Sequence, residues 1–309
     1  MSDASAPLGP AASAAALGAD AALARSAGAR LRRRVFGHRG LVIGGAVLAA
    51  ILATGLLAPV LAPHDPYAQD LARRLIPPVW QAKGGWEHPL GTDALGRDYL
   101  SRLMWGARIS LLIGAATALI SGLIGTAMGL AAGYFGGRPD LVVTYLVTVR
   151  LSMPVILVAL ATVALVGGSL PVVILVLGLL LWDRFAVVVR SATMQAASLD
   201  YVTAARAIGC STLRLVLGEI LPNVAGPLIV VATLEMAHAI LLEAALSFLG
   251  LGVQPPLPSW GLMIAEAKRF MFFSPWLITI PGTALMVLVL AINLLGDGVR
   301  DASAPDQRS

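Results

Sequence analysis

Four long runs of residues without a charged side chain constrain the fold more than any other feature of this sequence. They cover residues 40–63, 109–137, 151–182 and 270–296. Each run exceeds the roughly 20 apolar residues that a helix needs to cross the hydrocarbon core of a bilayer. The strands of a membrane barrel alternate in polarity over about 10 residues and leave no such runs. The sequence therefore predicts an all-α protein that crosses a membrane several times.

The positive charge of the chain is concentrated before the first apolar run. The formal net charge of +5 and a pI near 9.9 could suggest a nucleic-acid partner. Six arginines, however, precede that run: Arg25, Arg30, Arg32, Arg33, Arg34 and Arg39. Arginine-rich flanks of membrane helices stay in the cytoplasm. We therefore expect a cytoplasmic N-terminus and no nucleic-acid partner.

Six membrane spans give the simplest partition of the apolar sequence. They lie at about 40–62, 109–135, 140–166, 170–190, 223–247 and 274–296. An even number returns the C-terminus to the cytoplasm and places the loops at about 63–108 and 248–273 outside. Five of the six tryptophans fall in or beside these outer loops, where amphipathic rings favour the membrane interface: Trp80, Trp86, Trp105, Trp260 and Trp276.

The spans divide the chain into four parts. Residues 1–39 form a cytoplasmic arm, expected to be partly disordered because its start is rich in Ala, Ser, Gly and Pro. Residues 40–108 hold the first span and a long outer loop, residues 109–300 a five-helix core, and residues 301–309 a cytoplasmic tail. About 40 residues precede the first span, so a cleaved signal peptide is not expected. The single cysteine, Cys210, cannot form an internal disulfide.

Glycine recurs at every fourth position in the second span, at Gly125, Gly129, Gly133 and Gly137. Residues four apart share one face of a helix, and a face without side chains lets another backbone approach closely. The second span is therefore predicted to pack tightly against another helix.

A polar segment, SLDYVTAARAIGCSTLRLVLGEILPN (198–223), separates two apolar runs. Its pattern predicts a helix capped by Ser198, a left-handed turn at Gly209, and a second helix from about Thr212 that Pro222 ends. The small residues of the first helix could enter a groove on another protein. An interfacial helix lying on lipid explains the pattern equally well.

Several motifs resemble the permeases of binding-protein-dependent ABC importers. The segment TAARAIG, ending in EILPN, is similar to their cytoplasmic coupling loop. Four further stretches resemble the second permease of the dipeptide, oligopeptide and nickel group: HPLGTDALGRDYLSRLMWGARISLLIG, AGYFGGRPD, LSFLGLGVQPPLPSWGLM and NLLGDGVRDA. The likeness extends over about residues 40–304, in the same order along the chain.

This resemblance implies a six-span subunit of the type I importer fold in a prokaryotic cytoplasmic membrane, and it implies partners. They are a homologous second permease, two ATP-binding subunits, an extracytoplasmic solute-binding protein and membrane lipid. ATP and Mg²⁺ would bind the ATPases, since neither Lys83 nor Lys268 follows a glycine as a phosphate-binding loop requires. ATPase contact is expected within the loop 198–222, at Asp200, Tyr201, Thr203, Ala204, Ala205, Arg206, Gly209 and Leu213.

The chain departs from the family pattern at charged positions. Thr203 stands where the coupling motif has Glu, and two charges, Arg150 and Glu235, fall inside predicted spans at similar depth. An unpaired Arg near the bilayer middle costs about 2.5–3.5 kcal/mol on insertion scales. We therefore expect Arg150 to pair with Glu235, or less readily with Glu243, or these residues to line a translocation path.

The outer loops offer a surface for the solute-binding protein or merely cover the pore mouth. Candidate contacts are Asp93, Arg97, Asp98, Pro256 and Trp260. The four histidines show no spacing of a metal site, so no bound metal is expected.

Two other classes remain as alternatives. An ion-coupled secondary transporter usually shows inverted repeats, and none is evident. An intramembrane enzyme needs a nucleophile and base at membrane depth, where His238 has no matched Ser or Cys; no enzymatic activity of the chain itself is expected. Within the importer class, the cargo stays open among dipeptides, longer peptides, glutathione-like peptides and nickel complexes.

Overall fold

A computed structural model describes residues 39–303 of the chain. The predicted disorder of the N-terminal arm lies outside these residues, as does the end of the predicted tail. Within 39–303 the structure is built from helices, and β-pairing is limited to an isolated bridge between Thr92 and Asp98. The predicted all-α class is confirmed.

The helices long and apolar enough to cross a membrane number five within the described range. They are α2 (Arg39–Leu61), α3 (Tyr99–Phe135), α6 with α7 (Leu170–Leu180 and Trp182–Ala197), the stretch Thr212–Phe248 that ends in α10 (Leu221–Phe248), and α12 (Trp276–Ser303). A bent pair, α4 (Gly137–Leu151) and α5 (Val155–Val166), makes a sixth if it is taken as one span. The prediction of six spans agrees with this arrangement.

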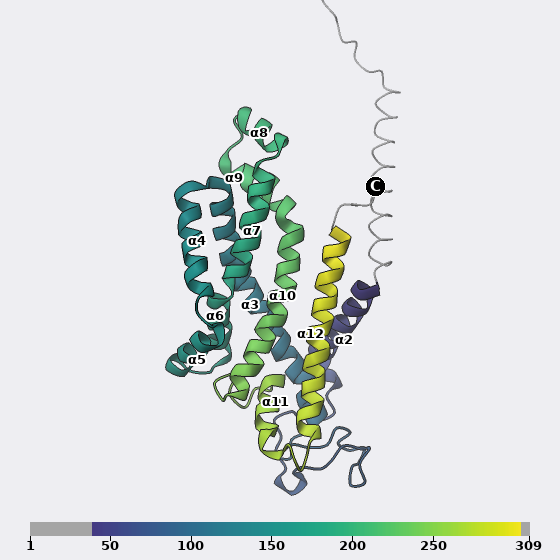
Figure 1. Ribbon diagram of the computed structural model, residues 1–309. Helices are drawn as coiled ribbons and strands as arrows, with labels where there is room; N and C mark the ends of the chain where they lie inside the picture. Colours follow the sequence, from purple (N-terminus) through teal and green to yellow (C-terminus); the bar gives the residue numbers. More distant parts are fainter. Residues whose placement is uncertain (1–38, 304–309) are drawn as a thin grey trace, which may run out of the picture.

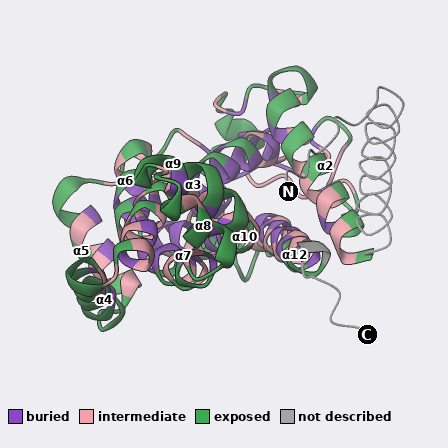
Figure 2. Ribbon diagram, turned by 90° about the horizontal axis from the view of Figure 1, so that it is seen from above, coloured by how far each residue is buried: buried purple, intermediate pink, exposed green. Residues whose placement is uncertain are grey.

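Helices α3, α7 and α10 form the middle of the molecule (Figure 1). Helices α2 and α12 pack together on one side, and α4, α5 and α6 lie on the other. The short helices α8 (Asp200–Ala207) and α9 (Thr212–Arg214) lie at one end. The opposite end holds α11 (Trp260–Ala267) and the loop after α2, with its 3₁₀ turn Leu71–Arg73. Buried residues gather between α3 and α7, whereas α4 and α8 are largely exposed (Figure 2).

The glycine face of α3 packs against α7, as the sequence predicts. A Cβ atom on Gly125 would lie 2.3 Å from the carbonyl oxygen of Trp182, and one on Gly129 would lie 2.8 Å from that of Ala186. Gly133 makes the same kind of approach one turn further along. Gly137 does not belong to this face: it begins α4 with a positive φ of 51°, and a Cβ atom there would meet nothing within 4 Å.

Helix α3 begins at Tyr99, about ten residues before the predicted start of the second span. Asp98 caps it, because its Oδ2 atom accepts hydrogen bonds from the backbone N–H and the hydroxyl of Ser101, both at 2.7 Å. The first turns are polar, but Arg102 is buried against the outer loop. The charged residues before position 109 therefore end the apolar run but do not end the helix, and the predicted start of the second span was too late.

The predicted third span is broken into two helices. Helices α4 and α5 meet at an angle of 82° across residues 152–154. Pro154 has no N–H to continue the helical hydrogen bonds of α4. Next to the break, Nε of Arg150 donates to the carbonyl oxygen of Leu180 at 2.7 Å, at the C-terminal end of α6, and Nη1 donates to that of Met153 at 3.4 Å. Arg150 thus joins two helix ends whose carbonyls lack helical partners.

The polar segment follows the predicted pattern of helix, turn and helix, with two differences. Ser198 ends α7, and Leu199 stands at the N-cap of α8 without a side-chain cap. Gly209 has a φ of 84° and closes α8 in a Schellman motif, since its N–H donates to Arg206 and that of Cys210 donates to Ala205.

Pro222 does not end the second helix of the segment. A π-helical turn, η2 (Leu215–Ile220), follows α9 and leads directly into α10. Pro222 lies in the first turn of α10, where a missing N–H is tolerated.

Candidate functional site

The polar segment presents an exposed tip at one end of the bundle. Ile208 is 87% exposed and Leu213 70% exposed. Seven of the residues predicted to contact an ATPase are exposed and the eighth, Ala205, is half-buried; the exposed ones are Asp200, Tyr201, Thr203, Ala204, Arg206, Gly209 and Leu213. Large apolar side chains rarely stand in water without a partner surface when they cluster at a tip. The tip therefore has the form of a docking surface.

The base of the polar segment is fixed to the bundle. Val202, Leu215 and Ile220 are buried in one cluster with Leu130 of α3 and Val189 of α7. Two polar contacts add to this packing: the amide of Asn223 donates to the Tyr201 hydroxyl at 2.9 Å, and the Arg206 guanidinium lies 5.3 Å from the centre of the Tyr134 ring. The base of the polar segment is therefore packed directly against α3 and α7.

Charged groups of α7 and α10 meet beside a groove between these two helices. Arg184 donates to Oε1 of Glu235 at 3.0 Å, and Nδ1 of His238 lies 3.4 Å from Oε2. The cavity beside Arg184 has a volume of about 710 Å³. Its walls are mostly apolar, with the charged side chains of Asp183, Arg184 and Arg300 among them. We call this cavity the α7–α10 groove.

The expected pair between Arg150 and Glu235 is wrong. Arg150 binds the carbonyl oxygens of Leu180 and Met153, and Glu235 binds Arg184. The expectation assumed a straight third span, in which equal depth brings two residues together. The 82° bend after Leu151 instead brings Arg150 to the end of α6. Arg184 is the partner of the buried Glu235 carboxylate.

Glu243 lies away from the groove and joins α10 to the start of α11. Its Oε1 atom accepts hydrogen bonds from Ser247 at 2.7 Å and Ser259 at 2.9 Å, and the side chain is almost completely buried. A place on a translocation path is therefore not supported for Glu243, and neither is a pair with Arg150.

A buried charge network ties the loop between α2 and α3, and the start of α3, to α11. Both Arg97 and Arg102 donate to Asp93 and to Oε2 of Glu266, the latter at 3.0 and 2.9 Å. Burial raises the pKa of the Glu266 carboxyl to about 7, and the nearby Arg97 opposes this shift. The network thus joins segments that lie more than 160 residues apart in the sequence.

Most of the residues expected to contact a binding protein are internal. Asp93, Arg97, Asp98 and Trp260 are buried, and Trp260 donates through Nε1 to the carbonyl oxygen of Leu103 at 2.8 Å. Only Pro256 of the five is exposed. The GTDALGRD motif therefore serves the internal structure of the outer end, which corrects the expectation of direct contact for those four side chains.

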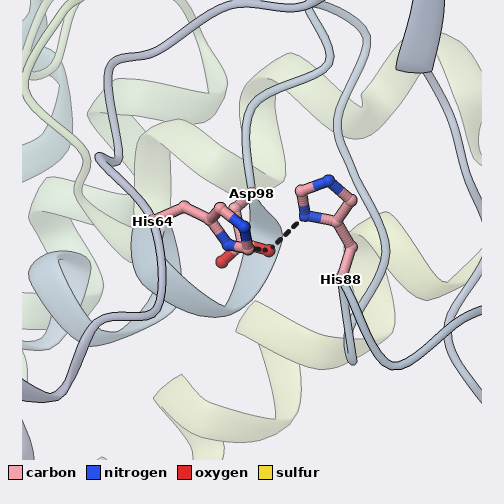
Figure 3. A group of neighbouring side chains, drawn as sticks. All are labelled: His64, His88 and Asp98. Atoms are coloured by element: carbon pink, nitrogen blue, oxygen red, sulfur yellow. Dashed lines mark hydrogen bonds and ion pairs between the residues drawn. The ribbon is translucent and has the colours of Figure 1, made fainter.

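His64 and His88 come together with Asp98 at the same end of the molecule (Figure 3). Nδ1 of His88 lies 2.8 Å from Oδ1 of Asp98, and Nδ1 of His64 lies 3.7 Å from the same oxygen. The argument that the histidines lack mutual spacing is wrong, because it compared positions in the sequence and the loop folds back on itself.

Sequence reasoning missed three residues that form the ion pairs described above: Arg102, Arg184 and Glu266. A charged residue between apolar positions of one helix turn is a signal that could have identified Arg102. Arg184 lies in the first turn of a helix that continues an apolar span. No local signal links Glu266 to Arg97.

The fold by itself indicates a class of protein. An all-helical chain with five or six helices long and apolar enough to cross a membrane, an exposed apolar tip and a groove with charged residues in its wall has the form of a membrane transport component. Two family models match it: "Binding-protein-dependent transport system inner membrane component" at residues 125–309, and "N-terminal TM domain of oligopeptide transport permease C" at residues 26–78. The chain belongs to the family of binding-protein-dependent transport system inner membrane components. It is a transport component and not an enzyme.

Curated relatives extend over nearly the whole chain. The di/tripeptide transport system permease protein DppC of Pseudomonas aeruginosa (strain UCBPP-PA14) is 43% identical over 271 residues, which is 87% of this chain and 89% of the relative. The dipeptide transport system permease protein DppC of Escherichia coli (strain K12) is 42% identical over 268 residues, with the same shares.

A solved structure supports the fold. A chain of the MetNI methionine ABC transporter in an inward-facing conformation superposes with a TM-score of 0.55 at 20% identity, and the match covers 66% of this chain and 97% of that chain.

Proposed function

We propose that this chain is a permease subunit of an ATP-binding-cassette importer that takes up di- or oligopeptides. The observation that carries the proposal is the identity of 40–43%, over 87% of the chain, to proteins named dipeptide or di/tripeptide permeases. The chain forms half of the translocation pathway in a prokaryotic cytoplasmic membrane, with both termini in the cytoplasm.

The partners are a homologous permease, two ATP-binding subunits and an extracytoplasmic solute-binding protein. ATP and Mg²⁺ bind the ATPases, which dock on the exposed tip around Ile208 and Leu213. Closure of the ATPases moves the tip, and the packed base of the polar segment transmits this movement to α3 and α7.

The α7–α10 groove is the best candidate for this chain's share of the pathway. It combines a mostly apolar wall with the guanidinium of Arg184, which is 57% exposed. A peptide carries a carboxylate at one end, and a partly exposed guanidinium is suited to bind it. Asp183, which also lines the groove, offers an opposite charge for an amino terminus.

Co-purification and transport test the proposal together. The chain is expressed with its second permease, ATPases and binding protein, and ATP-driven uptake of a labelled dipeptide into proteoliposomes is measured. A double substitution at the tip, I208D with L213D, is expected to abolish both ATPase recovery and uptake, because charge cannot enter an apolar docking groove.

A substitution at the opposite end of the molecule provides the matched control. Trp86 is 82% exposed in the outer loop, and W86S should leave ATPase recovery unchanged. Full recovery of the ATPases with the tip variant would refute docking at this site. Uptake by the chain alone, driven by an ion gradient without ATP, would refute the importer, and uptake of a nickel complex without competition from peptides would change the cargo.

A further inference from the structure

The cluster of His64, His88 and Asp98 joins three segments of the outer end. His64 follows the end of α2, His88 belongs to the loop before α3, and Asp98 is the N-cap of α3. Figure 3 shows both imidazole rings directed toward the Asp98 carboxylate. The three candidate ligand atoms, one from each side chain, all lie within 4.8 Å of one another.

The distances fit a small metal ion between the three side chains. Metal–ligand bonds of about 2.0–2.1 Å in a tetrahedral zinc site put neighbouring ligand atoms about 3.3 Å apart. The measured separations from Oδ1 of Asp98, 2.8 Å to His88 and 3.7 Å to His64, fall on either side of this value. Small rotations of the two rings would bring all three atoms to bonding distance.

The roles of the two carboxylate oxygens of Asp98 are already divided. Oδ2 accepts both hydrogen bonds from Ser101, and Oδ1 faces the histidines. The Ser101 hydroxyl in turn accepts the backbone N–H of His64 at 3.1 Å. Outer hydrogen bonds of this kind orient the ligands of protein metal sites.

His64 has an unfilled bonding position that points at the cluster. Its Nδ1 atom is buried and has no hydrogen-bond partner, although the side chain as a whole is 37% exposed. The His64 ring also lies against the His88 ring, with centroids 4.7 Å apart, but this contact leaves the Nδ1 atom of His64 without a hydrogen bond. A buried polar atom without a partner is rare and requires an explanation.

The surroundings favour a cation. A cavity of about 160 Å³ opens beside the cluster, and its lining includes Asp65, Asp70, Glu87 and the cluster itself. Four carboxylates line the cavity, and its one guanidinium, that of Arg73, pairs with two of them, those of Asp70 and Glu87. The cavity also has room for water, which can complete the coordination of the ion.

We propose that His64, His88 and Asp98 bind a divalent transition-metal ion of the zinc class, with water from the cavity as the remaining ligand. Two imidazoles and one carboxylate are a donor set that zinc accepts. The ion would tie the chain after α2 to the start of α3, and its effect is on the stability of the outer end. Metal binding at this site depends on these three side chains and is independent of the solute that the chain transports.

Metal binding by the purified full-length chain tests this directly. For this measurement the chain is prepared without a polyhistidine tag and with the substitution C210S, which removes its only thiol, that of Cys210. Binding of Zn²⁺ is measured by titration calorimetry, and Co²⁺ reports coordination through its visible absorption. We expect one ion per chain, and a loss of affinity of at least about tenfold with H64Q, as for removal of a zinc ligand or its close support.

His238 provides a matched control. It is also partly exposed, at 30%, and its Nδ1 also faces a buried carboxylate. H238Q should bind Zn²⁺ like the parent chain, and H88Q should lose the Co²⁺ absorption as H64Q does. Absence of binding by the parent chain, or equal binding by the parent and H64Q, would overturn the proposal.

Folding of the variants is checked by thermal unfolding without metal. H64Q removes no hydrogen bond of its own Nδ1 atom and loses only the ring contact with His88, so its metal-free unfolding temperature should lie close to that of the parent. Zinc should raise the unfolding temperature of the parent and not that of H64Q. An equal rise in both would also contradict the site.

Discussion

Arg184 and Glu235 form an ion pair of 3.0 Å in which the two partners differ sharply in exposure. The guanidinium is 57% exposed, whereas the carboxylate is 1% exposed. Removal of one partner therefore has a different consequence from removal of the other.

We predict that R184A destabilises the chain more than E235Q does. R184A leaves a buried carboxylate with only His238 beside it, which costs about 3–5 kcal/mol. E235Q leaves a guanidinium that water can reach, at a cost of about 1 kcal/mol or less. Unfolding of the detergent-solubilised chain, followed by tryptophan fluorescence, gives the order, and a larger loss with E235Q would contradict the assignment.

Arg150 should act through its hydrogen bonds to carbonyl groups and not through an ion pair. R150L leaves the carbonyl oxygen of Leu180 without this donor, and a buried unsatisfied group costs about 1–3 kcal/mol. R150K retains a donor and should lose less stability. The exchange R150E with E235R should rescue neither single variant, because the two residues do not meet; restored assembly in the exchange variant would show that they do.

Gly129 should tolerate no side chain. A Cβ atom there would lie 2.8 Å from both the carbonyl oxygen of Ala186 and Cβ of Val189. We expect G129A to cost about 1–3 kcal/mol, in the range of overpacked cores. G282A is the control: Gly282 also lies in a membrane helix, but its added Cβ would meet nothing within 4 Å. Alanine favours a helix over glycine by about 1 kcal/mol, so the control should be neutral or stabilising.

The Glu266 carboxyl should make the outer end sensitive to pH. Burial raises its pKa from 4.5 to about 7. The folded chain therefore holds this proton across a range in which the unfolded chain has released it, and stability falls as the pH rises from about 4.5 to 7. E266Q should remove this part of the pH dependence of the unfolding temperature. An unchanged pH profile in E266Q would place the titration elsewhere.

The sequence predicted those features that depend on neighbours along the chain. The lengths of the apolar runs placed the spans. The recurrence of glycine at every fourth position, at Gly125, Gly129 and Gly133, identified the packed face of α3. Gly209 was identified as a left-handed turn because few other residues adopt that conformation without strain. Each of these depends on one helix or one turn.

Features that depend on chain reversal were not predictable in the same way. The partner of Arg150 was misjudged because Pro154 breaks the span after it, and depth along a straight helix no longer gives position in space. His64 and His88 lie in a loop without periodicity, where sequence distance says little about contact. Asp98 looked like a surface charge, but it is held inside by Ser101 and His88.

The contact between the backbones of α3 and α7 has a mechanical consequence. Two helices separated by flexible side chains can slide past each other, whereas the glycine face of α3 lets the backbone of α7 approach with no compressible layer in between. Helix α7 ends at Ala197, directly before the polar segment, and α3 begins at Tyr99, whose hydroxyl donates to the carbonyl oxygen of Leu277 on α12. We therefore expect α3 and α7 to move as one rigid body, so that a displacement at one end of the molecule reaches the other end almost undiminished.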